Sequence, residues 1–272
     1  MGENPVKQKL LRGEAAFGTM AFECFVPGLP QIVKAAGAEF LLFDMEHSGL
    51  EFETLKQLIA ACRGIGLVPM CRVPAGQYHF IARALDIGAM GIMVPMVASA
   101  EEAAHVVACT RYPPQGRRGA AFGFAHDDYE GGSVADKMRV ANERTLVMAL
   151  IETAEGIGQV GKIAAVPGVD VLWLGHFDLT NFLGIPAQFE HPKYVRAVDR
   201  LTAAARRHGK VLACMSADEA WSRHYWALGF RLFAAGIDAH LLQWALRAAL
   251  EPLRACAATP APPPARARRG GR

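Results

Sequence analysis

The stretch Phe40-Leu41-Leu42-Phe43-Asp44-Met45-Glu46-His47 indicates both a fold and the place of a site. A run of apolar residues is typical of a strand that is buried on both faces. An Asp, a Glu and a His follow where this strand would end. These residues alone fit two interpretations: polar groups of a functional site, or a polar turn whose His caps the next helix. The rest of the chain decides between the two.

A short apolar run followed by a helical stretch recurs along the whole chain. The predicted strands are 16–22, 40–44, 68–73, 91–95, 145–152, 169–175, 210–215 and 231–236, and the predicted helices are 29–36, 51–63, 77–85, 99–110, 153–165, 193–208, 217–228 and 239–255. Eight such units in about 250 residues predict an α/β fold of the (β/α)8 TIM barrel type. The alternative, a doubly wound open sheet, lacks its glycine-rich phosphate turn after the first strand.

Length and composition favour one large domain, since the 272 residues are 52% hydrophobic. We predict a polar N-terminal segment at 1–12, a barrel domain at 13–256, and a disordered tail rich in Pro, Ala and Arg at 257–272. The connection 112–144 is too long for an ordinary loop. We expect it to form a lid or an oligomer contact. We expect the aldehyde to be recognised by residues 112–136, by the surroundings of Phe177 and by a neighbouring subunit.

The charge balance argues against a nucleic-acid-binding protein. Residues 259–272 hold four of the 29 basic residues and no acid, which leaves 25 basic against 26 acidic residues, or −1, in the rest of the chain. The six cysteines include no CxxC pair and read as reduced thiols. No apolar run has the length of a membrane span or a signal-peptide core. We therefore predict a soluble, cytoplasmic protein that binds neither nucleic acid nor membrane.

Ionisable groups follow four of the predicted strands, at the ends where (β/α)8 barrels carry their chemistry. Asp44, Glu46 and His47 follow the second strand, Arg72 ends the third, Glu152 ends the fifth, and Gly175-His176-Phe177-Asp178 follows the sixth. Arg72 and Glu152 interrupt strongly apolar strands, and a charge in such a place needs a partner.

Glu152 and Asp178 are predicted to bind a divalent metal ion. Two carboxylates from adjacent strands suit Mg²⁺ or Mn²⁺ and leave coordination positions for water and a chelating substrate. The alternative is that one of the two pairs with Arg72 instead. No Cys or His cluster has the spacing of a zinc site.

His47 and Arg72 complete the predicted site. The Asp44 carboxylate can orient the His47 imidazole, which could then act as a general base. Arg72 offers a planar fork for a substrate carboxylate. No lysine is well placed for Schiff-base chemistry inside the barrel. These groups together predict an enzyme for a small 2-oxo acid that works through a metal-stabilised enolate.

Five motifs resemble, in order, those of the HpcH/HpaI aldolases over about residues 13–253. They are Phe43–His47, Leu85–Ala89 with Val94–Val97, Arg111–Gly119, Ile151–Thr153 and Gly175–Leu179. The resemblance implies a metal-dependent (class II) pyruvate aldolase on a TIM barrel, similar to the 4-hydroxy-2-oxoheptanedioate and 2-keto-3-deoxy sugar-acid aldolases. It also implies a homo-oligomer, a hexamer or trimer, in which neighbouring subunits exchange the last helix.

The resemblance assigns the metal and the pyruvate to particular residues. Glu152 and Asp178 would bind Mg²⁺, Mn²⁺ or Co²⁺, which pyruvate chelates through its carboxylate and keto oxygens. Backbone groups around Gly175, His176 and Phe177 would bind the pyruvate carboxylate.

The resemblance also assigns the proton transfers. His47, paired with Asp44, would be the acid/base, and Arg72 would hold the keto or enolate oxygen. The role of Glu46 stays open between pairing with Arg72 and holding a metal-bound water.

The chain departs from the family pattern at Leu150, where relatives usually have Gln, and at His176 and Phe177, where they read Pro-Ala or Pro-Ser. A bulky Phe177 and a titratable His176 should reshape the pocket. Two rival reactions keep the same site: decarboxylation of oxaloacetate and cleavage of an acyl-CoA thioester. A rival of another class is a non-catalytic barrel that binds a 2-oxo acid.

Overall fold

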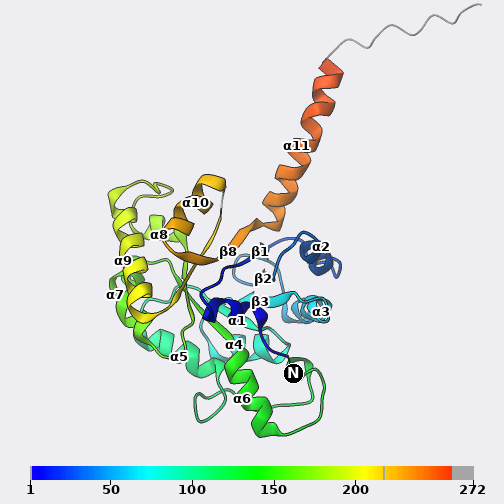
Figure 1. The fold of residues 1–272 in the computed structure, drawn as a ribbon, viewed down its shortest axis with the longest axis vertical. Helices are drawn as coiled ribbons and strands as arrows, with labels where there is room; N and C mark the ends of the chain where they lie inside the picture. The colour runs from blue at the N-terminus through cyan, green and yellow to red at the C-terminus, as the bar shows by residue number, and fades with distance from the viewer. Residues whose placement is uncertain (1, 217, 259–272) are drawn as a thin grey trace, which may run out of the picture.

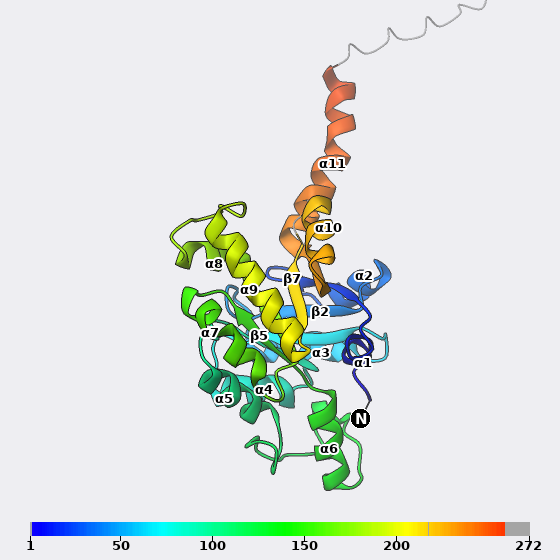
Figure 2. The same cartoon turned by 60° about the vertical axis from the view of Figure 1, so that its left-hand side comes forward.

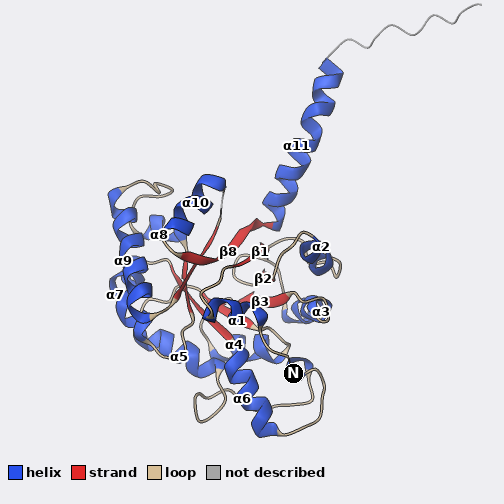
Figure 3. Ribbon diagram, in the orientation of Figure 1, coloured by secondary structure: helices blue, strands red, loops and turns tan. Residues whose placement is uncertain are grey.

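The computed structural model describes residues 2–216 and 218–258. Its parallel strands are hydrogen-bonded in chain order from β1 to β8, and β8 pairs with β1, so that the sheet forms a closed barrel. The strands form the centre of Figure 3 and most helices surround them. The prediction of a (β/α)8 barrel is confirmed.

The strands are β1 (Ala16–Ala21), β2 (Phe40–Asp44), β3 (Val68–Arg72), β4 (Gly91–Val94), β5 (Leu146–Ile151), β6 (Val171–Leu174), β7 (Val211–Met215) and β8 (Phe230–Ile237). The helices are α1 (Pro5–Leu11), α2 (Leu29–Ala35), α3 (Phe52–Cys62), α4 (Tyr78–Asp86), α5 (Ala100–Thr110), η1 (Ala125–Asp127), α6 (Val134–Arg144), α7 (Ala154–Ala165), α8 (His176–Phe182), α9 (Pro192–His208), α10 (Glu219–Ala227) and α11 (Asp238–Ala258). The sequence analysis missed α1, η1, α6 and α8.

Alternation along the strands decides which side chains point into the barrel. The interior apolar cluster includes Leu42, Met70 and Leu150. Asp44, Arg72 and Glu152 each lie two residues further along, and successive side chains of a strand alternate between its faces. The register of β2 and β3 places Asp44 opposite Arg72. Three charged groups therefore continue the inward-facing rows at the carboxyl ends of the strands.

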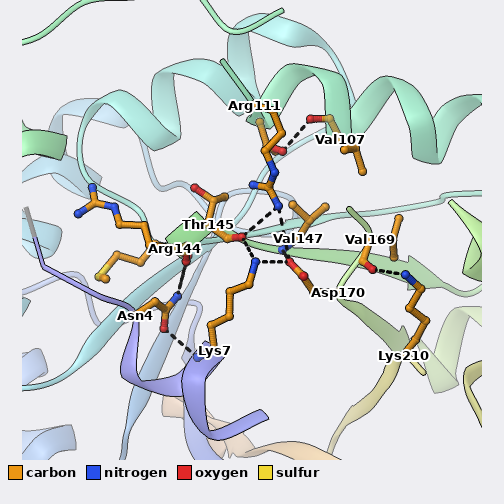
Figure 4. Close-up of polar contacts among 12 residues, drawn as sticks. Asn4, Lys7, Val107, Arg111, Arg144, Thr145, Val147, Val169, Asp170 and Lys210 are labelled. Carbon is orange, nitrogen blue, oxygen red and sulfur yellow. Dashed lines mark hydrogen bonds and ion pairs between the residues drawn. The ribbon is translucent and has the colours of Figure 1, made fainter. Parts of the chain in front are cut away.

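Helix α1 closes the N-terminal end of the barrel (Figure 4). Lys7 Nζ donates to the carbonyl oxygen of Thr145 at 2.8 Å and to Asp170 Oδ2 at 3.1 Å. Val6 and Leu10 are buried against the interior cluster. The segment that was predicted as a polar N-terminal stretch thus contributes apolar side chains to the core.

The long connection 112–144 does not form a lid over this barrel. It joins the end of α5 to the start of β5, at the N-terminal ends of the strands and opposite the predicted site. Arg118 Nη2 donates to Asp86 Oδ1, at the end of α4, at 2.6 Å. No residue of the connection lines the cavity at the carboxyl ends. The expectation of a lid over this barrel is therefore wrong, whereas the oligomer contact and a part in substrate recognition in a neighbouring subunit stay predictions.

Helix α11 projects away from the barrel in Figures 1 and 2. Its large apolar side chains Leu242, Trp244, Leu246 and Leu253 are exposed. No helix in the described part of the chain combines the length and apolar character of a membrane span. The tail predicted at 257–272 lies, from residue 259 on, outside the described residues.

Candidate active site

A cavity of about 250 Å³, which we term the mouth cavity, opens at the carboxyl ends of the strands. The predicted site residues on its wall are His47, Arg72, Glu152, Gly175, His176, Phe177 and Asp178. They come from four strand ends that are far apart in the sequence. No lysine lines the mouth cavity within the described residues, which agrees with the preference against Schiff-base chemistry.

Two carboxylates hold Arg72. Its Nε donates to Asp44 Oδ1 at 2.5 Å, and its Nη1 lies 3.0 Å from Glu46 Oε2. The Phe22 ring lies over the guanidinium, 5.3 Å from its centroid to the Arg72 carbon Cζ. The side chain of Arg72 is only 8% exposed, and its Nη2 has no hydrogen-bond partner among the described residues. Because buried donors are normally satisfied, this Nη2 is suited to bind an oxygen atom of a substrate.

The expected contact between Asp44 and the His47 imidazole is wrong. The Asp44 carboxylate accepts hydrogen bonds from the backbone amides of His47, at 2.8 Å, and Glu46, at 3.3 Å, and so fixes the turn rather than the ring. The half-exposed imidazole instead has its Nε2 3.7 Å from Glu46 Oε2. Burial raises the pKa of Glu46, and the positive charge of Arg72 opposes this shift. Of the two carboxylates, Glu46 rather than Asp44 thus lies beside the His47 ring, and it pairs with Arg72 as one of the two predicted alternatives.

Glu152 is a buried carboxylate, with only 3% of its surface exposed. Its Oε1 accepts a hydrogen bond from the backbone amide of Met96 at 2.8 Å. Burial raises the pKa of Glu152 to about 7, the Met96 amide opposes the shift, and the carboxylates of Glu46 and Asp178 add to it. A Cβ atom at position 175 would lie 2.5 Å from Glu152 Oε2, so Gly175 gives this carboxylate its space.

Asp178 lies in the first turn of α8, which starts directly after β6 and Gly175. It is half-buried and lies close enough to Glu152 to raise the pKa of that group. Among the described residues, no three His, Cys, Asp or Glu side chains lie together in a way that would hold a metal ion. Glu152 and Asp178 nevertheless fit a hard divalent ion, because both offer oxygen ligands and a cation would offset the crowded negative charge.

His176 and Phe177 have different surroundings. His176 is buried, and its ring centroid lies 4.9 Å from that of Trp221 and 5.6 Å from that of Phe189. Burial lowers the pKa of His176 to about 4, which favours the neutral imidazole. Phe177 is 53% exposed on the wall of the mouth cavity. Leu150 also lines this cavity.

Several residues of the mouth cavity were missed by the sequence analysis. They are Met20, Phe22, Met93, Trp173, Leu174, Met215, Ile237 and His240. Strand alternation could have indicated Met93 and Trp173, which precede the ends of β4 and β6. No local sequence pattern indicates that His240 lines the cavity, because its position depends on the direction in which α11 leaves β8.

The HpcH/HpaI aldolase/citrate lyase family model matches residues 22–245. The 5-keto-4-deoxy-D-glucarate aldolase of Klebsiella pneumoniae subsp. pneumoniae is 35% identical over 208 residues, which cover 76% of this chain and 80% of that protein. The hydroxypyruvate/pyruvate aldolase of Pseudomonas aeruginosa is 34% identical over 244 residues, or 90% of each chain.

The solved structures agree with these sequence comparisons. The crystal structure of an HpcH/HpaI aldolase from Desulfitobacterium hafniense DCB-2 superposes with a TM-score of 0.87 at 30% identity, over 92% of this chain and 96% of that one. The matched region spans all eight strands but the first, and it contains every residue predicted for the site.

Proposed function

Because the chain belongs to the HpcH/HpaI aldolase/citrate lyase family and is a carbon–carbon lyase of the aldolase type, we propose that it cleaves a 4-hydroxy-2-oxo acid into pyruvate and an aldehyde. The same site would catalyse the reverse addition. Pyruvate would enter the mouth cavity with its oxygens between Arg72 and the pair Glu152 and Asp178.

The observation that carries this proposal is the buried Glu152 carboxylate beside the unpartnered Nη2 of Arg72. Glu152 and Asp178 would hold Mg²⁺, Mn²⁺ or Co²⁺, which would act as a Lewis acid toward the negative charge that develops on the pyruvate oxygen. Arg72 Nη2 would donate a hydrogen bond to the same developing oxyanion. The fully buried Asp44 carboxylate accepts the hydrogen bond from Arg72 Nε and so fixes the guanidinium in place.

His47 would handle the proton of the substrate hydroxyl. In the cleavage direction the His47 imidazole accepts the proton from the C4 hydroxyl. The C3–C4 bond then breaks, and the electron pair of this bond passes into the enolate of pyruvate. C4 leaves as the aldehyde, and C3 is then protonated to give pyruvate. Glu46, 3.7 Å from His47 Nε2, would stabilise the protonated imidazole.

Pyruvate binding would also use the backbone at the start of α8, around Gly175, His176 and Phe177. Burial keeps His176 neutral, so it would contribute shape and hydrogen bonding rather than charge.

We further propose that α11 is exchanged between subunits of a hexamer or trimer, which would cover its exposed apolar side chains. The six cysteines form no disulfide, which supports the proposed cytoplasmic location.

Two measurements test the proposed reaction. Pyruvate release from 4-hydroxy-2-oxo acids should stop after complete removal of divalent metal and return when Mg²⁺ or Mn²⁺ is added; release that survives complete removal would contradict the metal site. The purified protein should also exchange the methyl protons of pyruvate with D₂O without any aldehyde. Exchange together with failure to cleave any hydroxy acid would favour the oxaloacetate decarboxylase or acyl-CoA lyase reaction instead.

A further inference from the structure

A second cavity of about 550 Å³, which we term the side cavity, adjoins the candidate active site. It lies between residues 74–77 and 94–97, and the first turns of α5 form its rim. Two contacts join it to the mouth cavity. Glu46 lines the side cavity and pairs with Arg72, and Met96 lines it and donates its amide to Glu152. A molecule in the side cavity would therefore lie next to the residues that we propose to bind pyruvate.

Apart from Arg72, which pairs with Glu46 from the mouth cavity, no cation compensates the negative charge of the side cavity within the described residues. Glu46, Glu101 and Glu102 line it, and within the described residues no lysine or arginine does. Its one histidine, His105, has Nε2 3.1 Å from the carbonyl oxygen of Gly76, so this nitrogen is already occupied.

The start of α5 does not supply a free anion site either. Ser99 Oγ accepts the Glu102 amide at 3.1 Å, and Glu102 Oε2 accepts the Ala98 amide at 2.7 Å. The helix thus satisfies one of its first-turn amides with the Ser99 side chain, and it places the carboxylates of Glu101 and Glu102 where an anion would bind.

The mouth cavity does not provide the missing charge. Arg72 is its one arginine or lysine in the part of the chain that the structure describes. That guanidinium already faces the carboxylates of Asp44 and Glu46. A substrate carboxylate beyond that of the pyruvate unit would thus enter a region of like charge with no partner, which is unfavourable.

The walls of the side cavity suit an uncharged molecule. Its apolar lining residues include Pro74, Val94, Met96, Val97 and Val106. We propose, on the basis of the function proposed above, that the aldehyde partner of pyruvate binds in the side cavity and carries no carboxylate. The absence of a cation beside Glu101 would then select against acidic aldehydes.

The test compares two aldehydes of equal chain length that differ only in a terminal methyl or carboxylate group, butanal and succinic semialdehyde. The full-length protein is supplied with Mn²⁺ and pyruvate, and kcat/KM is measured for aldol addition to each. We expect the value for butanal to exceed that for succinic semialdehyde by at least about tenfold. An equal or higher value for succinic semialdehyde would overturn the inference.

Charge reversal tests the location. Glu101→Lys places a cation on the rim and should reduce the preference for butanal by at least about fivefold, and Glu101→Gln should reduce it less. Glu143→Lys on α6, at the other end of the barrel, changes the net charge equally and should leave the preference unaltered. A preference that Glu101→Lys does not change would overturn the placement of the aldehyde in the side cavity.

The proton exchange of pyruvate in D₂O separates this inference from the proposed function. If the wild-type protein exchanges the methyl protons but prefers succinic semialdehyde, only the inference on the aldehyde fails. If the metal-supplied protein shows no exchange, the proposed function fails, and the inference fails with it.

Discussion

A methyl group on Gly175 would lie 2.5 Å from Oε2 of Glu152. Carbon and oxygen atoms that are not bonded do not approach so closely, so any side chain at 175 must displace the carboxylate. Gly175 stands at the junction of β6 and α8, three residues before Asp178. The backbone of one strand thus determines where the carboxylate of its neighbour can lie.

Gly175→Ala should therefore impair the site without unfolding the barrel. We expect Mn²⁺ affinity and the rate of pyruvate proton exchange to fall at least about tenfold, because a displaced ligand binds its metal ion more weakly. Titration calorimetry would measure the Mn²⁺ affinity, proton NMR in D₂O would measure the exchange, and circular dichroism would show whether the barrel stays folded. Gly158→Ala on α7 is the matched control, since a Cβ there would have no neighbour within 4 Å. Equal Mn²⁺ affinity in both variants would contradict the role of Gly175.

In the metal-free protein the contribution of Glu152 to stability should fall as the pH rises from about 4.5 to about 7, whereas His176, with a pKa lowered to about 4 by burial, contributes in the opposite direction. The carboxyl of Glu152 has a pKa of about 7 in the folded protein, against 4.5 as its ordinary value. The folded state binds this proton more tightly than the unfolded state, so the stabilisation is fully present below pH 4.5 and is lost on the way to pH 7. The expected loss from Glu152 alone, measured as the difference between the wild-type protein and Glu152→Gln, is about 3 kcal/mol.

Urea unfolding at several pH values, with a chelator present, would measure this loss. Glu152→Gln removes this titrating group, so the stability of the wild-type protein relative to the variant should fall over this range, and saturating Mn²⁺ should raise the stability of the wild-type protein most at pH 7 and above. A wild-type profile that rises between pH 5 and pH 7 and is unaffected by Glu152→Gln would contradict the prediction.

His47→Ala should separate two reactions. Retro-aldol cleavage needs a base for the hydroxyl proton, so its kcat should fall by about 10²–10⁴. Oxaloacetate decarboxylation needs no such proton transfer and should fall much less. Coupled assays of pyruvate formation from both substrates would measure the difference, and an equal loss in both would argue that His47 binds substrate rather than moving a proton.

Glu46→Gln and Asp44→Asn should affect catalysis differently. Glu46 lies beside the His47 imidazole, so its neutral variant should shift the pH dependence of kcat. Asp44 contacts the guanidinium of Arg72 and the backbone of His47 but not the ring, so Asp44→Asn should lower kcat through Arg72 without shifting the pH dependence of kcat. A pH profile that moves only in Asp44→Asn would restore the pairing expected from the sequence.

Lys7→Ala should destabilise the protein by about 1–3 kcal/mol without affecting the site at the other end of the barrel. The substitution removes the ammonium that binds the Thr145 carbonyl and Asp170. Lys162→Ala, at an exposed position on α7, should change stability by less than about 0.5 kcal/mol. Thermal unfolding of the two variants would measure the difference, and equal stabilities would contradict the contribution of Lys7 to the barrel.

The sequence by itself determined the strand order, the barrel and most of the residues at its mouth. Continuous apolar runs such as Phe40–Phe43 specify buried strands, and a period of two places Asp44 in the inward-facing row of its strand. The family resemblance rested on these same motifs. Local patterns sufficed because a strand fixes both the direction of each side chain and the end at which it emerges.

Only the tertiary structure decided which of these side chains touch. Asp44 and Glu46 lie two residues apart in the sequence. Because of the turn between them, the Asp44 carboxylate contacts the backbone amide of His47 and the guanidinium of Arg72, whereas the Glu46 carboxylate lies beside the His47 ring. The placement of the 112–144 connection likewise followed from the closure of the barrel. Hydrogen-bond distances depend on turn geometry and on strands brought together from distant parts of the chain, and neither is encoded in the spacing of the residues along it.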